Sequence, residues 1–82
     1  MAKKTVFITG GTGNMGWAAV QEMLKKSNEI NIKMLARKSA KNEELLKHII
    51  AKPNVKVIWG DLLDYDAILE GVTGSDYVLH VG

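Results

Sequence analysis

A glycine-rich turn directly after an apolar run limits the possible folds of this sequence more than any other feature. The run Thr5–Thr9 is apolar and β-branched, and glycines follow it at positions 10, 11, 13 and 16. Such a run is typical of a strand that is buried on both faces of a parallel sheet. From residue 13 onward, apolar side chains recur at spacings of three and four, which predicts an amphipathic helix ending near Ser27 and Asn28. The segment therefore has the pattern of a strand that turns sharply into a helix.

The rest of the sequence continues this alternation of strands and helices. Strands are predicted over 31–36, 55–59 and 76–81, where apolar and β-branched residues gather. Two further helices are predicted between them, because the side-chain oxygens of Ser39 and Asp64 can cap a helix. Pro53 stops the first of these helices, and the second ends near Gly71. The first carries an apolar stripe that consists of Leu45, Leu46, Ile49 and Ile50.

This strict alternation determines the fold class. Consecutive strands joined through helices run parallel, with right-handed crossovers and helices on both faces of the sheet. We therefore expect an α/β fold, a Rossmann-type doubly wound parallel sheet, of which residues 1–82 form the amino-terminal βαβαβαβ portion. Because such sheets usually have about six strands, the sequence looks truncated after the fourth. Exposed sheet edges and an uncovered face would then favour self-association.

The composition excludes several classes of protein. The chain has a hydrophobic fraction of 46% and a charged fraction of 24%, as ordinary globular proteins do. A net charge of +2, with no aromatic residues interleaved among the lysines, does not indicate nucleic-acid binding. No apolar run approaches the roughly 20 residues of a membrane span, and no targeting signal is evident, so we expect no membrane partner and a cytoplasmic location. Cysteine is absent and His48 has no second histidine at helical spacing, so no metal site is expected.

The glycine turn has the chemistry of a pyrophosphate-binding site. The first amides of a helix lack partners and its dipole is positive there, so an anion is favoured at this end. Gly10 permits the sharp turn, Gly13 has no Cβ to hold a phosphate away, and Gly16 lets the helix pack closely on the strand. The predicted cofactor contacts at this turn are Gly10, Thr12, Gly13, Asn14, Met15 and Gly16.

The spacing of these glycines leaves an alternative open. It is Gly-x-x-Gly-x-x-Gly, whereas the common dinucleotide fingerprint is Gly-x-Gly-x-x-Gly. A turn that needs glycines only for packing would show the same residues. No Gly-Lys-Ser/Thr ends the turn, so a P-loop is excluded.

The end of the second predicted strand bears on the choice of cofactor. An acidic residue there would bond the ribose hydroxyls of NAD, but this sequence has Arg37 and Lys38. Neither can accept from a hydroxyl, and both can pair with a phosphate. NADP, which carries a 2′-phosphate, is therefore favoured over NAD, unless these two are only solvated loop cations.

At this point the sequence resembles the extended short-chain dehydrogenase/reductase family, the NAD(P)-dependent epimerases, dehydratases and reductases. Three stretches carry the resemblance, and they follow one another in the family's order: residues 6–16, 60–62 and 74–81. The resemblance implies that Asp61 takes the adenine amino group, that Leu62 lies against the adenine ring, and that Gly82 lies near the cofactor's ribose. A helix cap is the alternative role for Asp61. His80 is interpreted as a packed, hydrogen-bonded core residue and not as a catalyst.

The sequence also departs from the family. Asn14 stands where the family often has an aromatic residue, and Gly82 where alanine is usual. The family's tyrosine-x-x-x-lysine pair is absent, since Leu69 follows Tyr65 at the fourth place and Val81 follows Tyr77. No residue is therefore predicted to be catalytic, and the catalytic and substrate-binding parts are expected beyond residue 82.

Four aromatic residues are given structural interpretations. Tyr65 and Tyr77 are interpreted as loop or helix-packing residues. Packing is favoured for Trp17 over contact with a neighbouring chain, and for Trp59 ordinary burial is favoured over stacking on adenine.

The resemblance implies two classes of function. The first is the cofactor-binding portion of an epimerase, dehydratase or reductase that acts by hydride transfer on a small molecule, with nucleotide sugars as the commonest substrates. The second is a non-catalytic NAD(P)-binding regulator that senses the redox state of the cofactor.

Overall fold

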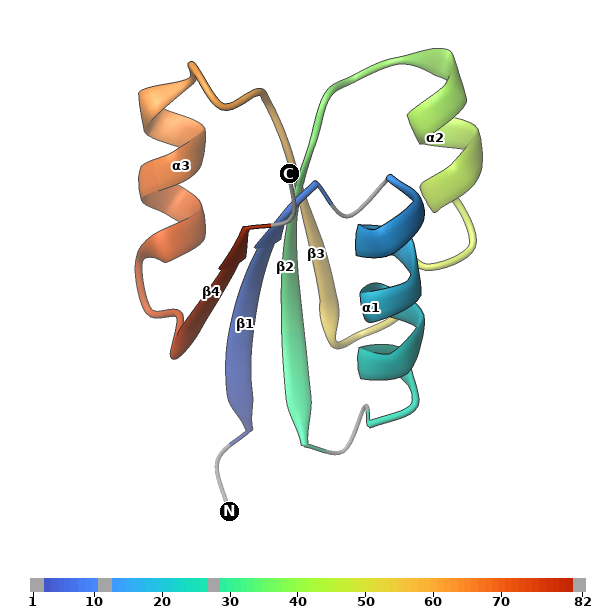
Figure 1. The fold of residues 1–82 in the computed structure, drawn as a ribbon, viewed down its shortest axis with the longest axis vertical. Helices are drawn as coiled ribbons and strands as arrows, with labels where there is room; N and C mark the ends of the chain where they lie inside the picture. Colours follow the sequence, from blue (N-terminus) through green and yellow to red (C-terminus); the bar gives the residue numbers. More distant parts are fainter. Residues whose placement is uncertain (1–2, 11–12, 27–28, 81–82) are drawn as a thin grey trace.

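The computed structural model describes residues 3–10, 13–26 and 29–80. Strands and helices alternate along these residues as the sequence predicts (Figure 1). The elements are β1 (Lys4–Thr9), α1 (Asn14–Leu24), β2 (Ile30–Ala36), α2 (Ala40–Leu46), β3 (Val55–Trp59), α3 (Tyr65–Val72) and β4 (Tyr77–His80). The predictions for Thr12, Ser27, Asn28, Val81 and Gly82 lie outside the described residues.

The four strands form one parallel sheet in the order β3-β2-β1-β4. The side on which strands are added changes at β1. The chain places β2 and then β3 on one side of β1, and it places β4 on the other side. In open α/β sheets, ligands bind outside the carboxyl ends of the strands, near such a reversal. The predicted α/β, Rossmann-type fold is therefore confirmed.

Helices cover both faces of the sheet. Figure 1 shows α1 and α2 on one face and α3 alone on the other. Two apolar clusters fill the layers between helices and sheet. The cluster under α1 and α2 contains Ile8, Val20, Ile32, Met34, Ala36, Leu46, Ile49 and Val55, and the smaller cluster under α3 contains Phe7, Leu35, Ile58 and Ala67. Consecutive residues such as Phe7 and Ile8 enter opposite clusters because side chains alternate along a strand.

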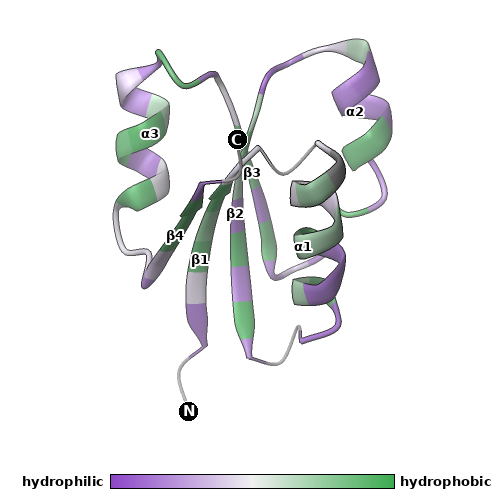
Figure 2. Ribbon diagram, viewed as in Figure 1, coloured by the Kyte–Doolittle hydropathy of each residue, from purple (hydrophilic) through white to green (hydrophobic). Residues whose placement is uncertain are grey.

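Strand β2 is less apolar than a strand covered on both faces usually is. Figure 2 shows hydrophobic and hydrophilic residues alternating along it. Lys33 lies on the α3 face, and its ammonium donates to the backbone oxygens of Thr73 at 2.6 Å and Glu70 at 3.3 Å. A cation at the carboxyl end of a helix complements the helix dipole. Lys33 of β2 therefore holds the carboxyl end of α3.

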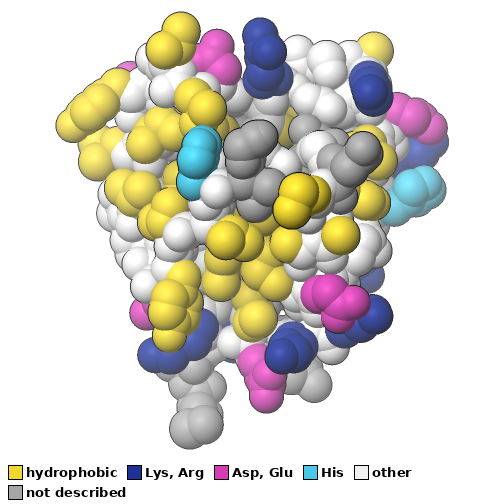
Figure 3. Space-filling model, viewed as in Figure 1, with side chains coloured by type: hydrophobic (Ala, Val, Ile, Leu, Met, Phe, Trp, Pro, Cys, Tyr) yellow, Lys and Arg dark blue, Asp and Glu magenta, His cyan; other side chains and the backbone are white. Residues whose placement is uncertain are grey.

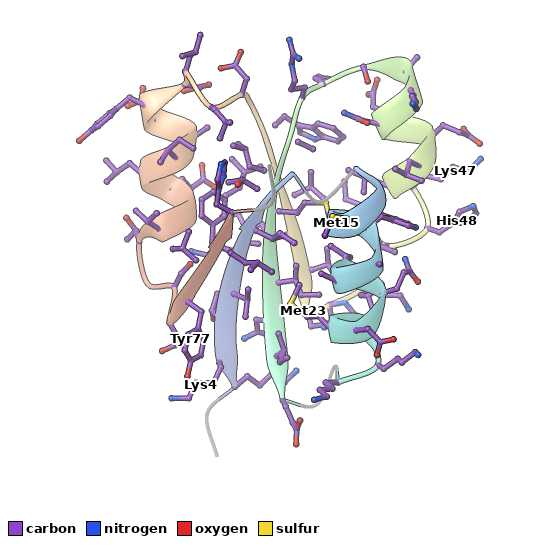
Figure 4. All side chains as sticks on the ribbon, in the orientation of Figure 1. Lys4, Met15, Met23, Lys47, His48 and Tyr77 are labelled. Atoms are coloured by element: carbon purple, nitrogen blue, oxygen red, sulfur yellow. The ribbon has the colours of Figure 1, made fainter. Side chains whose placement is uncertain are left out.

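The helix α2 is shorter than its apolar stripe predicts. It ends at Leu46, whose backbone oxygen accepts from the amides of both Ile49 and Ile50 as the chain passes into a turn. Ile49 is nevertheless buried in the core, while Ile50 is exposed. The stripe correctly indicates the burial of Ile49 but not of Ile50, and it gives the wrong end of the helix. Figure 4 shows Lys47 and His48, just after α2, pointing away from the sheet.

Strand β4 and the outer side of α3 form an exposed apolar surface. Tyr77, Val78 and Leu79 are all exposed, and so are Tyr65, Leu69 and Val72 at helical spacing on α3. Hydrophobic side chains gather over this part of the molecule in Figure 3. The interpretation of the two tyrosines as loop or helix-packing residues is therefore wrong, since Tyr65 begins α3, Tyr77 begins β4 and both are exposed. Among the described residues, no helix is both long enough and apolar enough to cross a bilayer.

Candidate functional site

The turn between β1 and α1 begins with a backbone conformation that favours glycine. Gly10 has a φ of 75°, in the left-handed region that side chains disfavour. The amide of Gly13 donates to the oxygen of Gly10 at 3.1 Å, and that of Trp17 to the oxygen of Gly13 at 2.7 Å. The first of these bonds closes the turn, so the Gly13 amide is not among the donors that the turn presents outward.

The donors at this turn therefore belong to the first turn of α1. Gly13 is the N-cap residue, and without a side chain it gives these amides no cap hydrogen bond. First-turn amides have no acceptor within their own helix, and those of α1 begin at Asn14. Gly16 is buried, whereas the Met15 side chain is 79% exposed at the amino-terminal end of α1, as Figure 4 shows. Thr12 and the side chain of Asn14 lie outside the described residues.

Two adjoining hollows lie beside this turn, at the carboxyl ends of β1, β2 and β3. The larger has a volume of about 440 Å³ and the smaller of about 370 Å³. Their walls share Arg37, Gly60, Asp61 and Leu63. The larger is also lined by Lys38, Trp59 and Asp64, and the smaller by Thr9, Gly10, Leu35, Ala36, Asn42 and Leu62.

The hollows bring together predicted site residues that are far apart in the sequence. Gly10 comes from the end of β1, Arg37 and Lys38 follow β2, and Asp61 and Leu62 follow β3. Cations thus stand on the β2 side and carboxylates on the β3 side. In the described parts of the chain, the ion pairs are Lys25–Glu22, Lys47–Glu44 and Lys56–Glu70, and none of them includes Arg37 or Lys38.

The two carboxylates at the hollows have different local roles. One oxygen of Asp64 accepts from the amide of Ala67 at 3.1 Å and so caps α3. Asp61 instead accepts from the amide of Leu63 at 2.8 Å, within the turn before the helix. The alternative that Asp61 caps the helix is therefore wrong. A carboxylate has several acceptor positions, so Asp61 retains capacity for a further donor.

His80 differs from the sequence interpretation in one respect. Its Nδ1 is hydrogen-bonded to the hydroxyl of Thr9, which confirms a bonded histidine, but its side chain is exposed and not packed in the core. The strand β4 lies at the edge of the sheet, so its side chains are less covered than those of β1. The favoured packing of Trp17 is confirmed, since it packs against the larger apolar cluster, and Trp59 packs there too but is only partly buried. Trp59 in addition lines the larger hollow.

Asn42 is a residue of the site that was not predicted from the sequence. Asn42 donates through its side chain to the backbone oxygen of Arg37 at 2.7 Å, and it lines the smaller hollow. The sequence does place Asn42 in the first turn of a helix, because it follows the cap residue Ser39. It does not predict the contact of the Asn42 side chain, because that contact depends on where the preceding loop lies.

Comparison with known proteins gives a consistent result. The model of the NmrA-like family matches residues 2–81. UDP-glucose 4-epimerases from Rickettsia akari and Rickettsia prowazekii are 35% and 37% identical over 79 and 81 residues. Each match covers 94% of this chain and 23% of the relative, so the chain spans less than a quarter of these curated relatives' length.

A solved structure supports the same relationship. The X-ray structure of Pen from Bacillus thuringiensis superimposes with a TM-score of 0.81 at 29% identity, covering 98% of this chain and 25% of that one. The resemblance to extended short-chain dehydrogenase/reductases, and hence to an NAD(P)-binding class of protein, is confirmed by these matches. From the family model and the shared fold, the chain belongs to the NmrA-like family.

Proposed function

We propose that this chain binds the adenosine and pyrophosphate half of a nicotinamide dinucleotide at the carboxyl ends of β1, β2 and β3. The observation that carries the proposal is one juxtaposition: the turn that leads into the uncapped start of α1 borders, at Gly10, the smaller of two adjoining hollows, and Arg37, Lys38 and Asp61 line these hollows. A dinucleotide needs donors for its pyrophosphate, an acceptor for its adenine and, in NADP, cations for its 2′-phosphate. These groups stand along the same edge of the sheet.

The proposed roles follow from the chemistry of each group. The turn formed by Gly10, Thr12, Gly13, Asn14, Met15 and Gly16 holds the pyrophosphate, with the backbone amides of the first turn of α1 as donors. Asp61 accepts from the adenine amino group and Leu62 covers the ring. Arg37 and Lys38 pair with a 2′-phosphate, which favours NADP over NAD. Gly82 leaves room for the ribose.

The reaction is a proposal for the whole polypeptide. The curated relatives are UDP-glucose 4-epimerases, and the chain matches less than a quarter of their length. We propose that the chain supplies the cofactor-binding portion of an epimerase, dehydratase or reductase, with a nucleotide sugar as substrate and hydride transfer as the chemistry. The cofactor, when bound, would supply or accept the hydride. This chain's residues would bind and orient it.

A redox-sensing regulator that binds NAD(P) without turnover is the rival function. Both functions use the same binding site, so the chain's own residues do not separate them. A tyrosine-x-x-x-lysine pair elsewhere in the polypeptide, together with turnover of a nucleotide sugar, supports the enzyme. Dinucleotide binding without such a pair and without turnover supports the regulator.

The binding proposal is tested by titrating the chain with NADPH and NADH and following tryptophan fluorescence. The decisive variant is Gly13→Ala, because the atom of the described residues that a Cβ at this position would meet is the oxygen of Gly10, at an ordinary contact distance of 3.5 Å. The fold should therefore tolerate the methyl group, while the close approach of a phosphate should be lost. We expect affinity to fall by at least about tenfold, the scale of one good phosphate interaction.

Two controls make this result interpretable. Ala18→Val adds bulk to an exposed position one turn further along α1 and should leave affinity unchanged. Urea denaturation should show that Gly13→Ala folds normally. Unchanged affinity in Gly13→Ala would remove the pyrophosphate role, and equal or tighter binding of NADH would remove the role of Arg37 and Lys38.

A further inference from the structure

Asn42 occupies an unusual position between the helix α2 and the loop that precedes it. We infer that its side-chain amide holds this loop in place and thereby sets the preference for a 2′-phosphorylated nucleotide. The inference rests on the proposed function, since it concerns how Arg37 and Lys38 are presented at the hollows. It assigns Asn42 a positioning role and no direct contact with the 2′-phosphate.

The hydrogen bonds around Asn42 close the loop on itself. Its Nδ2 donates to the backbone oxygen of Arg37 at 2.7 Å. Its own backbone amide donates to the hydroxyl of Ser39 at 3.1 Å. One residue thus links the start of α2 to both ends of the three-residue connection that leaves β2.

The loop contains the two cations that the site requires. Residues 37–39 belong to no helix or strand, and all three are exposed. Arg37 lines both hollows and Lys38 lines the larger one. A loop of this kind samples many conformations unless something restrains it, and its ordering opposes binding. The hydrogen bond from Asn42 reaches the backbone of Arg37 itself, so it restrains the residue that lines both hollows.

The neighbouring backbone hydrogen bonds do not restrain Arg37 or Lys38. The amide of Gly60 donates to the oxygen of Ala36 at 2.9 Å and extends the pairing of β2 with β3 by one residue. The amide of Glu43 donates to the oxygen of Ser39 at 2.8 Å, within the first turn of α2. Between these two anchors, the described contact on the backbone of Arg37 and Lys38 is the one from Asn42.

The consequence is a specific form of selectivity. A preorganised loop loses little freedom when Arg37 engages a phosphate, so the restraint favours ligands that carry a 2′-phosphate. A ligand without that phosphate does not engage Arg37 and gains nothing from the restraint. Loss of the Asn42 amide should therefore weaken one class of nucleotide and leave the other unchanged.

The test compares 2′,5′-ADP with 5′-AMP, which isolate the adenosine half of the two cofactors, by calorimetric titration of the whole chain. We expect Asn42→Ala to lower the affinity for 2′,5′-ADP about fivefold, the scale of coupling between groups in contact, and to change that for 5′-AMP less than about twofold. Ser39→Ala is the matched control, because it removes the helix-capping bond but leaves the amide bond to Arg37. It should leave the ratio of the two affinities unchanged.

A double variant completes the cycle. In an Arg37→Ala background, Asn42→Ala should have no further effect on that ratio, because the side chain that the loop presents is gone. The inference is overturned if Asn42→Ala preserves the ratio, weakens both nucleotides equally, or acts as strongly without Arg37 as with it. If the unmodified chain shows no preference for 2′,5′-ADP, the NADP assignment itself fails, and the inference falls with it.

Discussion

The hydroxyl of Thr9 and the Nδ1 atom of His80 lie 2.5 Å apart at the carboxyl ends of the neighbouring strands β1 and β4. Thr9 is buried, whereas His80 is exposed. Their contact joins the sheet at the point where the strand order reverses, directly before the turn at Gly10. The edge strand is therefore fixed at the end of the sheet that faces the candidate site.

Replacing Thr9 with valine tests the contribution of this hydrogen bond. Valine has nearly the same shape, and the freed histidine nitrogen can bond to water because the ring is exposed. We expect a loss of about 1 kcal/mol in the free energy of unfolding, the typical net value of one hydrogen bond. Urea denaturation measures this loss. In a His80→Ala background Thr9→Val should cost much less, because the partner of the hydroxyl is gone, and an unchanged loss there would contradict the assignment.

Asp61 and Asp64 line the same hollow, but we expect their replacement to have opposite effects on stability and on cofactor binding. Asp64→Ala removes the cap of α3 and should lower the free energy of unfolding by about 1 kcal/mol, with a smaller effect on cofactor affinity. Asp61→Ala should leave stability nearly unchanged, because its bond to Leu63 lies in an exposed turn, but should weaken dinucleotide binding. Denaturation and titration of both variants check this reciprocal pattern. Binding that survives in Asp61→Ala would remove the adenine role.

Lys33 and Lys56 are register partners on β2 and β3, but only one is expected to matter for stability. Lys33→Met keeps an apolar stem and removes the donor to the backbone oxygens of Thr73 and Glu70, so we expect a loss of about 1 kcal/mol. Lys56→Met breaks an exposed ion pair with Glu70, which is worth at most about 1 kcal/mol and often nothing measurable. The two variants are compared by thermal unfolding. A larger effect from Lys56 would contradict the role given to Lys33.

Gly71 lies directly against the ring of Phe7 on the inner side of α3, where an added Cβ would overlap the ring atoms. Gly71→Ala should therefore destabilise the protein by about 1–3 kcal/mol through overpacking, despite alanine's better helix propensity. Chemical denaturation measures the change. In a Phe7→Leu background the added cost of Gly71→Ala should fall, and a cost that stays the same would show that the ring is not the cause.

The sequence predicts the succession of strands and helices along the chain, and the layers they form, well because these follow from local patterns. The apolar run before Gly10 and the alternation of Ile32, Met34 and Ala36 each determine which side chains enter the core. The caps at Ser39 and Asp64 are also correct, since each cap hydrogen bond joins residues only three apart. The approximate location of the candidate site follows as well, because parallel strands bring their carboxyl ends to one edge.

Other features depend on contacts between distant segments and cannot be read from local patterns. The side chain of Lys33 reaches the end of α3 across 40 residues of sequence, and His80 meets Thr9 across 71. The exposure of His80 follows from the position of β4 at the sheet edge. The end of α2 at Leu46 reflects a turn that keeps Ile49 buried without continuing the helix. Asn42 was not predicted because its partner is the backbone of a loop.

The long separation between β1 and β4 also bears on how the sheet assembles. Pairing β1 with β2 closes a short loop through α1, whereas pairing β1 with β4 closes a loop of 71 residues between Thr9 and His80. Loop closure opposes folding more strongly as the loop grows. We expect β4 to join last and to open first, so that its backbone amides exchange with deuterium well before those of β1 and β2. The hydrogen bond between Thr9 and His80 would then be among the last contacts to form as the chain folds.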